Sequence, residues 1–167
     1  MQLKYLIKDV MEVGYKRNHH TVVMHGTNCK NAFGSGFAGA VAKRWPIVKE
    51  AYHKCQRKAL GEVQSVVTPE GVIVFNCFTQ ENYGYDGKRY ADPNAILKCV
   101  NTCLHAGKIL SEVSKQPIRF YMPRIGCDLG GLDWVTEVRP ELIALLNNRY
   151  YDFDACLNII RRENDKC

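Results

Sequence analysis

The stretch VVMHGTNCKNAFGSGFAGAVAKRW, residues 22–45, sets the expectation for the rest of the chain. It begins with a short apolar run, Val22–Met24, which predicts a buried strand, and it continues into a polar loop that contains His25 and Asn28. The glycine-rich turn Gly34–Gly36 follows, and the small residues after it predict a helix. A strand end, a polar loop and a helix start can direct several backbone N–H groups at one anion. We therefore expect half of a phosphate-binding site here.

The other half is expected in residues 122–134, a second glycine-rich loop after an apolar run. Around these two loops the chain alternates between strand-like and helix-like segments. Strands are predicted over residues 3–7, 22–24, 63–68, 72–78, 118–122 and 150–157. Helices are predicted over residues 37–44, 47–60, 93–110 and 134–146, and residues 159–167 are expected to form a charged, peripheral tail. This alternation predicts a single α/β domain built around a mixed sheet, with both loops at the carboxyl ends of strands, where ligands bind.

The composition is that of one soluble domain: 167 residues, 46% of them apolar and 24% charged. The sequence contains no apolar run near the roughly 18 residues of a membrane span, and the start of the chain carries charges within its apolar stretch. We therefore expect a cytoplasmic protein without a membrane partner. The net charge of +6 suits an anionic ligand as well as plain solubility, and its even spread does not indicate specific nucleic-acid binding.

Eight cysteines raise the question of disulfides or zinc, but their spacing supports neither. The sequence has no C-x-x-C pair, and Cys99 and Cys103 stand four apart in a helical segment without a second pair nearby. We expect reduced cysteines, no metal and no cofactor.

Residues 34–39 match the dinucleotide fingerprint G-x-G-x-x-G, but their context does not. In that motif the glycines follow the strand at once, and an acidic residue stands about 20 positions later at the end of another strand. Here nine residues separate Met24 from Gly34, and Glu50 falls in a helical pattern. A P-loop and a cysteine phosphatase are excluded as well, because no G-K-[ST] is present and neither Cys29 nor Cys127 is followed by a phosphate-binding Arg. Binding of NAD(H) in a Rossmann-type site is thus the weakest reading.

Two side chains in the loops could do chemistry. His25 stands between a strand and the first loop, where a histidine is either a hydrogen-bonded structural residue or an acid–base catalyst. Asp128 is either a turn residue or a carboxylate directed at a ligand. Spacing alone leaves these alternatives open.

The segments MHGTNCKNAFGSGFAGAVAKRWP and YMPRIGCDLGGLDW resemble the macro domain family, which binds ADP-ribose. The similarity is greatest to its ADP-ribose 1″-phosphate phosphatases and to the related terminal ADP-ribose glycohydrolases. Asp9 and the segment FTQENYG, residues 78–84, fit the same pattern, and the resemblance covers about residues 3–157. It implies a three-layer α/β/α sandwich with a mixed sheet of about six strands.

The resemblance also implies roles for individual residues. Asp9 would accept a hydrogen bond from the adenine amino group, and Asn28 would hold the distal ribose, with His25 beside it at the reacting end. The first loop would contact the distal ribose and diphosphate through Gly34, Ser35, Gly36 and Phe37. The second loop would enclose the diphosphate through Ile125, Gly126, Cys127, Asp128, Leu129, Gly130 and Gly131. Phe153 or Asn158 would lie near the base.

Two departures from the glycohydrolases decide between the branches. Those relatives use a Lys to attack the ribose where this chain has Gln80, which we expect to contact the substrate, and an Asp where it has Gly130. The resemblance therefore implies a metal-independent phosphatase that converts ADP-ribose 1″-phosphate to ADP-ribose and phosphate. His25 would be the general base, and Asn28 and Asp128 would assist it. The alternatives are a non-catalytic reader of free or protein-linked ADP-ribose, and a hydrolase that removes ADP-ribose from modified proteins. We expect a monomer.

Overall fold

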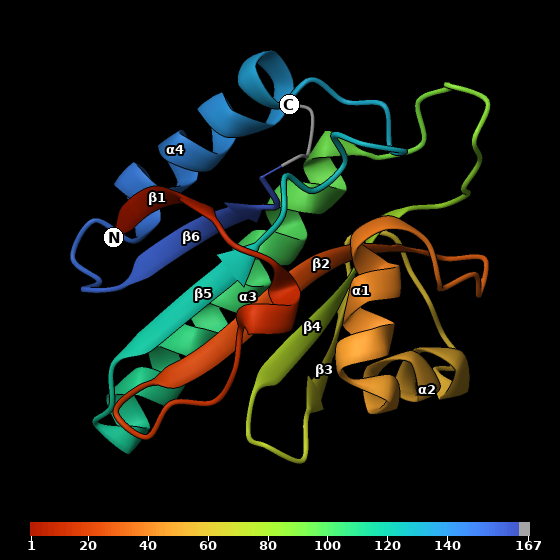
Figure 1. Cartoon of the computed structure of the whole chain (residues 1–167). Coiled ribbons are helices and arrows are strands. Elements are labelled where there is room, and N and C mark those ends of the chain that lie inside the picture. The colour runs from red at the N-terminus through yellow and green to blue at the C-terminus, as the bar shows by residue number, and fades with distance from the viewer. Residues whose placement is uncertain (164–167) are drawn as a thin grey trace.

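The computed structural model describes residues 1–163 and contains one six-stranded sheet. Along the sheet the strands follow the order β1-β6-β5-β2-β4-β3, and each neighbouring pair is parallel except β3–β4 (Figure 1). The strands are β1 (Gln2–Ile7), β2 (His20–Asn28), β3 (Val63–Val67), β4 (Ile73–Gln80), β5 (Ile118–Met122) and β6 (Cys156–Arg161). The carboxyl ends of the parallel strands therefore meet at one edge of the sheet.

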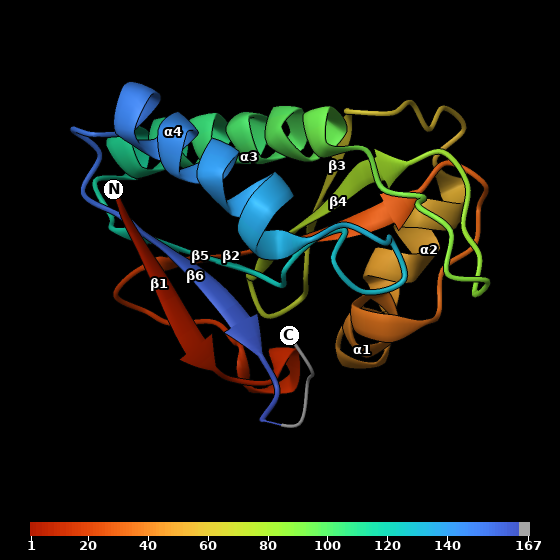
Figure 2. The ribbon, with the colours of Figure 1, turned by 90° about the horizontal axis from the view of Figure 1, so that it is seen from above.

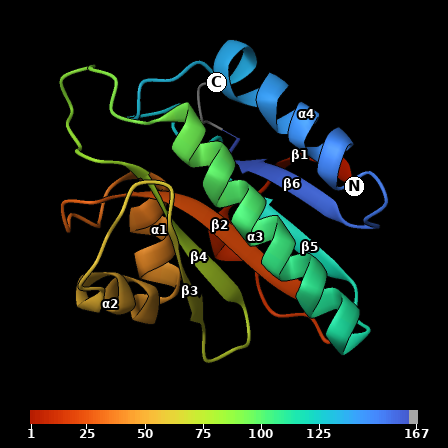
Figure 3. The same ribbon diagram turned by 180° about the vertical axis from the view of Figure 1, so that it is seen from behind.

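Helices cover both faces of this sheet and complete a three-layer sandwich (Figures 2 and 3). One face carries η1 (Val10–Glu12), α1 (Gly36–Arg44) and α2 (Pro46–Lys54), whose buried side chains form one apolar cluster with the sheet. The other face carries α3 (Pro93–Ser114), η2 (Trp134–Val138) and α4 (Arg139–Arg149), which form a second cluster. The predicted α/β/α sandwich with a mixed sheet is confirmed.

The central strand β2 explains why the sheet needs both layers. Val22 and Met24 belong to the cluster under α3, whereas Val23 belongs to the cluster under α1 and α2. A parallel strand that is buried on both faces reads as a continuous apolar run, as residues 22–24 do. On the α3 side, Asp92 caps the helix by accepting a hydrogen bond from Ala95 N at 2.9 Å.

Two of the predicted segments are shorter than expected or displaced. The helix predicted over residues 47–60 ends at Lys54, because Cys55 takes an extended conformation and its carbonyl accepts a hydrogen bond from Lys58 Nζ. The strand predicted over residues 150–157 is β6, which starts only at Cys156. Tyr150 and Phe153 instead close a turn, in which Phe153 N donates to Tyr150 O at 3.1 Å.

The prediction of a peripheral tail over residues 159–167 is therefore wrong for its first residues. Ile159 and Ile160 are buried in β6, and the strand continues to Arg161. Residues 164–167 lie outside the described part of the chain.

Candidate functional site

A cleft of about 750 Å³ lies along the edge of the sheet at which the parallel strands end. Each of these strands contributes residues at or just after its carboxyl end: Asp9 after β1, Arg161 in β6, Arg124 after β5, Asn28 in β2 and Gln80 in β4. Ligands of open α/β sheets bind at this edge, where the loops that follow the strands converge. The cleft is the candidate functional site.

The first glycine loop brings the N-terminus of α1 to the cleft wall. Gly39 N donates to Ser35 O at 3.0 Å, so the N–H groups of the preceding first turn are left without an intrahelical acceptor. A side chain at Gly39 would place its Cβ 2.7 Å from Gly34 O, so only glycine lets the loop fold back this closely on the helix. These N–H groups and the helix dipole together favour an anion here.

The second glycine loop, residues 125–131, supplies a matching set of donors. The loop closes on itself, since Leu132 N donates to Gly126 O at 2.9 Å. Within residues 1–163, no hydrogen-bond acceptor of the protein is found for the N–H groups of Gly126, Asp128 and Leu129. All three residues line the cleft, so their N–H groups are available to a bound anion.

The two loops face each other across the cleft. The position that a Cβ of Gly36 would occupy lies 3.9 Å from Asp128 Oδ2, so the Asp128 carboxylate stands opposite the start of α1. Most predicted site residues indeed line the cleft: Asp9, Asn28, Gly34, Ser35, Gly36, Phe37, Gln80, Ile125, Gly126, Cys127, Asp128, Leu129 and Gly130. Gly131 does not line it, and a Cβ at this position would point at the backbone of Lys88 and Arg89.

His25 is not at the cleft, which corrects the expected position of the general base. Its side chain is fully buried, and its ring packs edge-on against Phe33 with 5.5 Å between the centroids. Its Nε2 lies 2.6 Å from Asn76 Oδ1, and because that oxygen only accepts, Nε2 carries the proton. Burial lowers the pKa of His25 to about 4. The imidazole is buried and does not line the cleft, so it is not placed to take a proton from water there.

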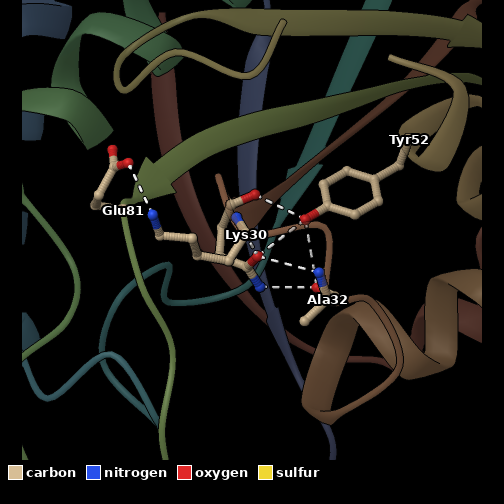
Figure 4. A network of polar contacts seen from close by, with 5 residues as sticks. Lys30, Ala32, Tyr52 and Glu81 are labelled. Atoms are coloured by element: carbon tan, nitrogen blue, oxygen red, sulfur yellow. Dashed lines mark hydrogen bonds and ion pairs between the residues drawn. The ribbon is translucent and has the colours of Figure 1, made fainter. Parts of the chain in front are cut away.

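Asn28 lines the cleft and is held by a polar network. Its partners Lys30, Ala32 and Tyr52 are labelled in Figure 4, where dashed lines mark the contacts. Its Oδ1 accepts hydrogen bonds from Lys30 N and Ala32 N, and its Nδ2 donates to Ala32 O at 2.7 Å. The hydroxyl of Tyr52 from α2 reaches the same residue. The loop that follows β2 is therefore fixed from within.

Asp9 marks the β1 end of the cleft. Its Oδ1 accepts a hydrogen bond from Met11 N at 2.8 Å, and its own N–H donates to Glu12 Oε2, so the start of η1 is a capping box. The second carboxylate oxygen of Asp9 can accept from a ligand.

Phe153 and Asn158, which were expected near the adenine base, do not line this end of the cleft. Phe153 packs in the core against Phe120, and Asn158 Nδ2 donates to Phe120 O at 2.9 Å. The expectation for both residues was wrong, because the last strand starts at Cys156 and not at Tyr150. The β1 end is lined instead by Lys8, Val10, Ile160, Arg161 and Arg162.

Several lining residues were not expected from the sequence. Tyr83 and Tyr85, exposed in the loop after β4, lie at the opposite end from Asp9. Arg124 lies 5.8 Å from the centre of the Tyr5 ring, and its buried Nε has no hydrogen-bond partner in the described part of the chain. The segments that contain Tyr83 and Arg124 already stood out in the sequence, but only the fold directs these side chains to the cleft.

Cys127 lines the cleft and Cys29 follows the lining residue Asn28 without lining it, and both thiols are poor nucleophiles. Burial raises the pKa of Cys127 to about 12 and that of Cys29 to about 11. Among residues 1–163, no group of three or more His, Cys, Asp or Glu side chains is arranged to hold a metal ion. None of the described helices is long and apolar enough to cross a membrane.

No family model matches the chain. Its sequence is 27% identical over 142 residues to an uncharacterized 17.5 kDa protein of the tk-vs intergenic region of Enterobacteria phage T4, which covers 80% of this chain and 84% of that protein.

Solved structures resemble it more completely. The macrodomain of Mycobacterium tuberculosis DarG superimposes with a TM-score of 0.70 at 21% identity, over 95% of this chain and 97% of that one. Thermosipho africanus DarTG, solved in complex with ADP-ribose, gives a TM-score of 0.68 at 15% identity, over 99% of this chain and 43% of that one. Together with the strand order and the two helical layers, these similarities show that the chain has the fold of the macrodomains.

Proposed function

We propose that the cleft binds ADP-ribose. The observation that carries the proposal is the pair of facing glycine loops. Their N–H groups without a protein acceptor among residues 1–163 lie at the middle of a cleft that runs from Asp9 to Gln80. The order of the strands fixes this direction: β1 lies at one end, β5 and β2 with their loops in the middle, and β4 at the other end. An extended ligand with a central diphosphate matches this distribution of donors.

The two ends of the cleft suit the two ends of ADP-ribose. Asp9 can accept the adenine amino group at the β1 end, and Asn28 and Gln80 can hydrogen-bond a ribose at the β4 end. The ADP-ribose bound to DarTG supports this choice of ligand over other diphosphates.

Replacing Asp9 with Asn is expected to weaken ADP-ribose binding about tenfold. The amide oxygen of an Asn can still accept from Met11 N, so η1 keeps its cap, but the NH₂ group then meets the adenine amino group, donor against donor. Isothermal calorimetry measures the affinity. Asp92→Asn is the matched control, because Asp92 caps α3 in the same way and does not line the cleft. Equal affinities of the two variants would contradict the role of Asp9.

We further propose that the chain hydrolyses ADP-ribose 1″-phosphate. A phosphate on C1″ would lie near the start of α1, where N–H groups and the helix dipole stabilise charge, and Asp128 faces this position. The water oxygen would bond to phosphorus while the bond from phosphorus to the C1″ oxygen breaks. Asp128 would orient the water and accept its proton, and would then return this proton to the C1″ oxygen, which leaves as a hydroxyl.

A phosphate-release assay tests this activity. Asp128→Asn is expected to slow phosphate release about tenfold or more, because an amide can orient water but cannot accept its proton. ADP-ribose affinity, measured in parallel, is expected to change little. Binding of ADP-ribose without any phosphate release by the wild-type chain would identify a reader in place of an enzyme.

Removal of ADP-ribose from modified proteins has less support. The relatives that do so use an Asp where this chain has Gly130, and a Cβ at this position would lie 2.6 Å from Gly126 O and 2.8 Å from Ala91 Cβ. This backbone has no space for a carboxylate there.

A further inference from the structure

The side chain of Asn28 is oriented by three donors. Its Oδ1 lies 2.9 Å from Lys30 N, 3.3 Å from Ala32 N and 2.9 Å from the hydroxyl oxygen of Tyr52. Its Nδ2 lies 2.7 Å from Ala32 O, which can only accept. This arrangement fixes which end of the amide is oxygen and which is nitrogen.

The fixed amide has one hydrogen-bonding group left for a ligand, the second N–H of Nδ2. Two backbone N–H groups and the shared proton of the Tyr52 hydroxyl already occupy Oδ1, whereas Nδ2 has two hydrogens and Ala32 O takes one of them. Asn28 lines the cleft next to Gln80, its partner across β2 and β4. Asn28 therefore presents a donor to the cleft and selects an oxygen acceptor, such as a ribose hydroxyl.

Tyr52 is the one side chain among these three donors, and it comes from a different element. It stands in α2, it is fully buried, and it does not line the cleft. Its ring packs against Phe33, 4.9 Å away between centroids, and against Phe78 at 6.2 Å. The hydroxyl also lies 2.8 Å from Asn28 O, so its one proton is shared between the two oxygens of this residue, as the dashed lines from Tyr52 in Figure 4 mark. Burial raises the pKa of Tyr52 to about 12, which keeps the donated proton in place.

The opposite side of the loop is held less firmly. Cys29 N donates to Gln80 O at 3.0 Å, and Lys30 Nζ lies 3.8 Å from Glu81 Oε1 (Figure 4). Both partners of this ion pair are more than half exposed, and exposed pairs contribute little. The buried contact from Tyr52 is the stronger constraint on the side chain of Asn28.

We infer that Tyr52 is a positioning residue for the distal-ribose end of the cleft, where it holds the Asn28 amide ready to donate. The inference rests on the proposed binding of ADP-ribose. Through Tyr52, α2 would affect the affinity for the distal ribose although α2 does not line the cleft.

The chain offers a matched control for a test. Tyr150 is also buried, and its hydroxyl lies 2.9 Å from both Asn101 O and Asn101 Oδ1, the same pattern as at Asn28, but it is outside the cleft. Tyr52→Phe and Tyr150→Phe each remove one hydroxyl and keep the ring, so both are expected to fold and to lose similar stability.

Only Tyr52→Phe is expected to weaken ADP-ribose binding, by about five- to tenfold. ADP, which lacks the distal ribose, is expected to bind Tyr52→Phe and the wild-type chain within about twofold, as judged by calorimetry. An equal loss of ADP-ribose affinity in the two variants would overturn the inference. So would an equal loss for ADP and ADP-ribose in Tyr52→Phe, which would show a general disturbance of the cleft.

Amide hydrogen exchange separates this inference from the proposed function. The amides of Lys30 and Ala32 are expected to exchange faster in Tyr52→Phe than in Tyr150→Phe, without any ligand. Failure of ADP-ribose to bind the wild-type chain would overturn the proposed function. The exchange comparison would still decide whether Tyr52 orders this loop: faster exchange confined to Tyr52→Phe supports it, and equal rates overturn it.

Discussion

Acidification from about pH 7 to about pH 4.5 is expected to reduce the free energy of unfolding by about 2 to 3 kcal/mol through His25 alone. In the folded chain His25 is buried and neutral, and its pKa is lowered from 6.5 to about 4. In the unfolded chain it takes up a proton near its ordinary pKa. Between these two values the unfolded state binds more protons, so stability is present above the unfolded pKa and is lost as the pH falls toward 4.

Urea denaturation of the wild-type chain and of His25→Gln at both pH values measures this effect. A glutamine can donate to Asn76 Oδ1 in place of the imidazole, but it does not titrate. Burial and neighbouring positive charges also lower the pKa of His19, and this contribution is common to both proteins. The difference between the two pH dependences therefore isolates His25. The same pH dependence in both would show that His25 is accessible to protons when folded.

Gly130→Ala is expected to reduce ADP-ribose affinity by roughly 5- to 150-fold, the equivalent of the 1–3 kcal/mol that overpacking costs. The new methyl group would lie 2.6 Å from Gly126 O and 2.8 Å from Ala91 Cβ, both of which belong to packed backbone or core. Relief of this overlap displaces the second glycine loop and with it the donor groups of Gly126, Asp128 and Leu129.

A loss of stability must be distinguished from a loss of loop geometry. Gly107→Ala serves this purpose, because its Cβ would lie 2.3 Å from the buried ring of Phe120, far from the cleft. Both variants are expected to melt at lower temperature in calorimetric scans, and only Gly130→Ala is expected to lose affinity. Wild-type affinity of Gly130→Ala would mean that the second loop does not position the ligand.

The position of His25 illustrates how far the sequence predicts the site. The apolar run Val22–Met24 predicts a strand that ends just before His25, but β2 continues to Asn28. Gly26 and Thr27 give no apolar signal, so the sequence pattern does not reveal this extension. Because side chains alternate along a strand, His25 points to the same side as Val23, into the cluster under α1 and α2. An error of four residues at a strand end thus moves a predicted catalyst into the core.

The glycine loops were predictable because their requirements are local. A turn that approaches its own helix, as at Gly39, admits no side chain, and this constraint is visible in the sequence itself. The contribution of Tyr52 is different, since it depends on how α2 packs against β2 and β4. The late start of β6 also depends on tertiary packing. The aromatic residues near Tyr150 favour a strand in the sequence pattern, but they pack in a turn.

The pairing of β1 with β6 affects the order in which the walls of the cleft can form during synthesis. Gln2 lies opposite Cys156, so the first strand made waits for the last before it finds its partner. Contacts between such distant segments form late, because a long chain must close first. The β1 end of the cleft has Asp9 on one side and Arg161 on the other. It therefore cannot form while β6, which contains Arg161, is still inside the ribosome. The glycine loops can fold earlier, and the β1 end completes the cleft.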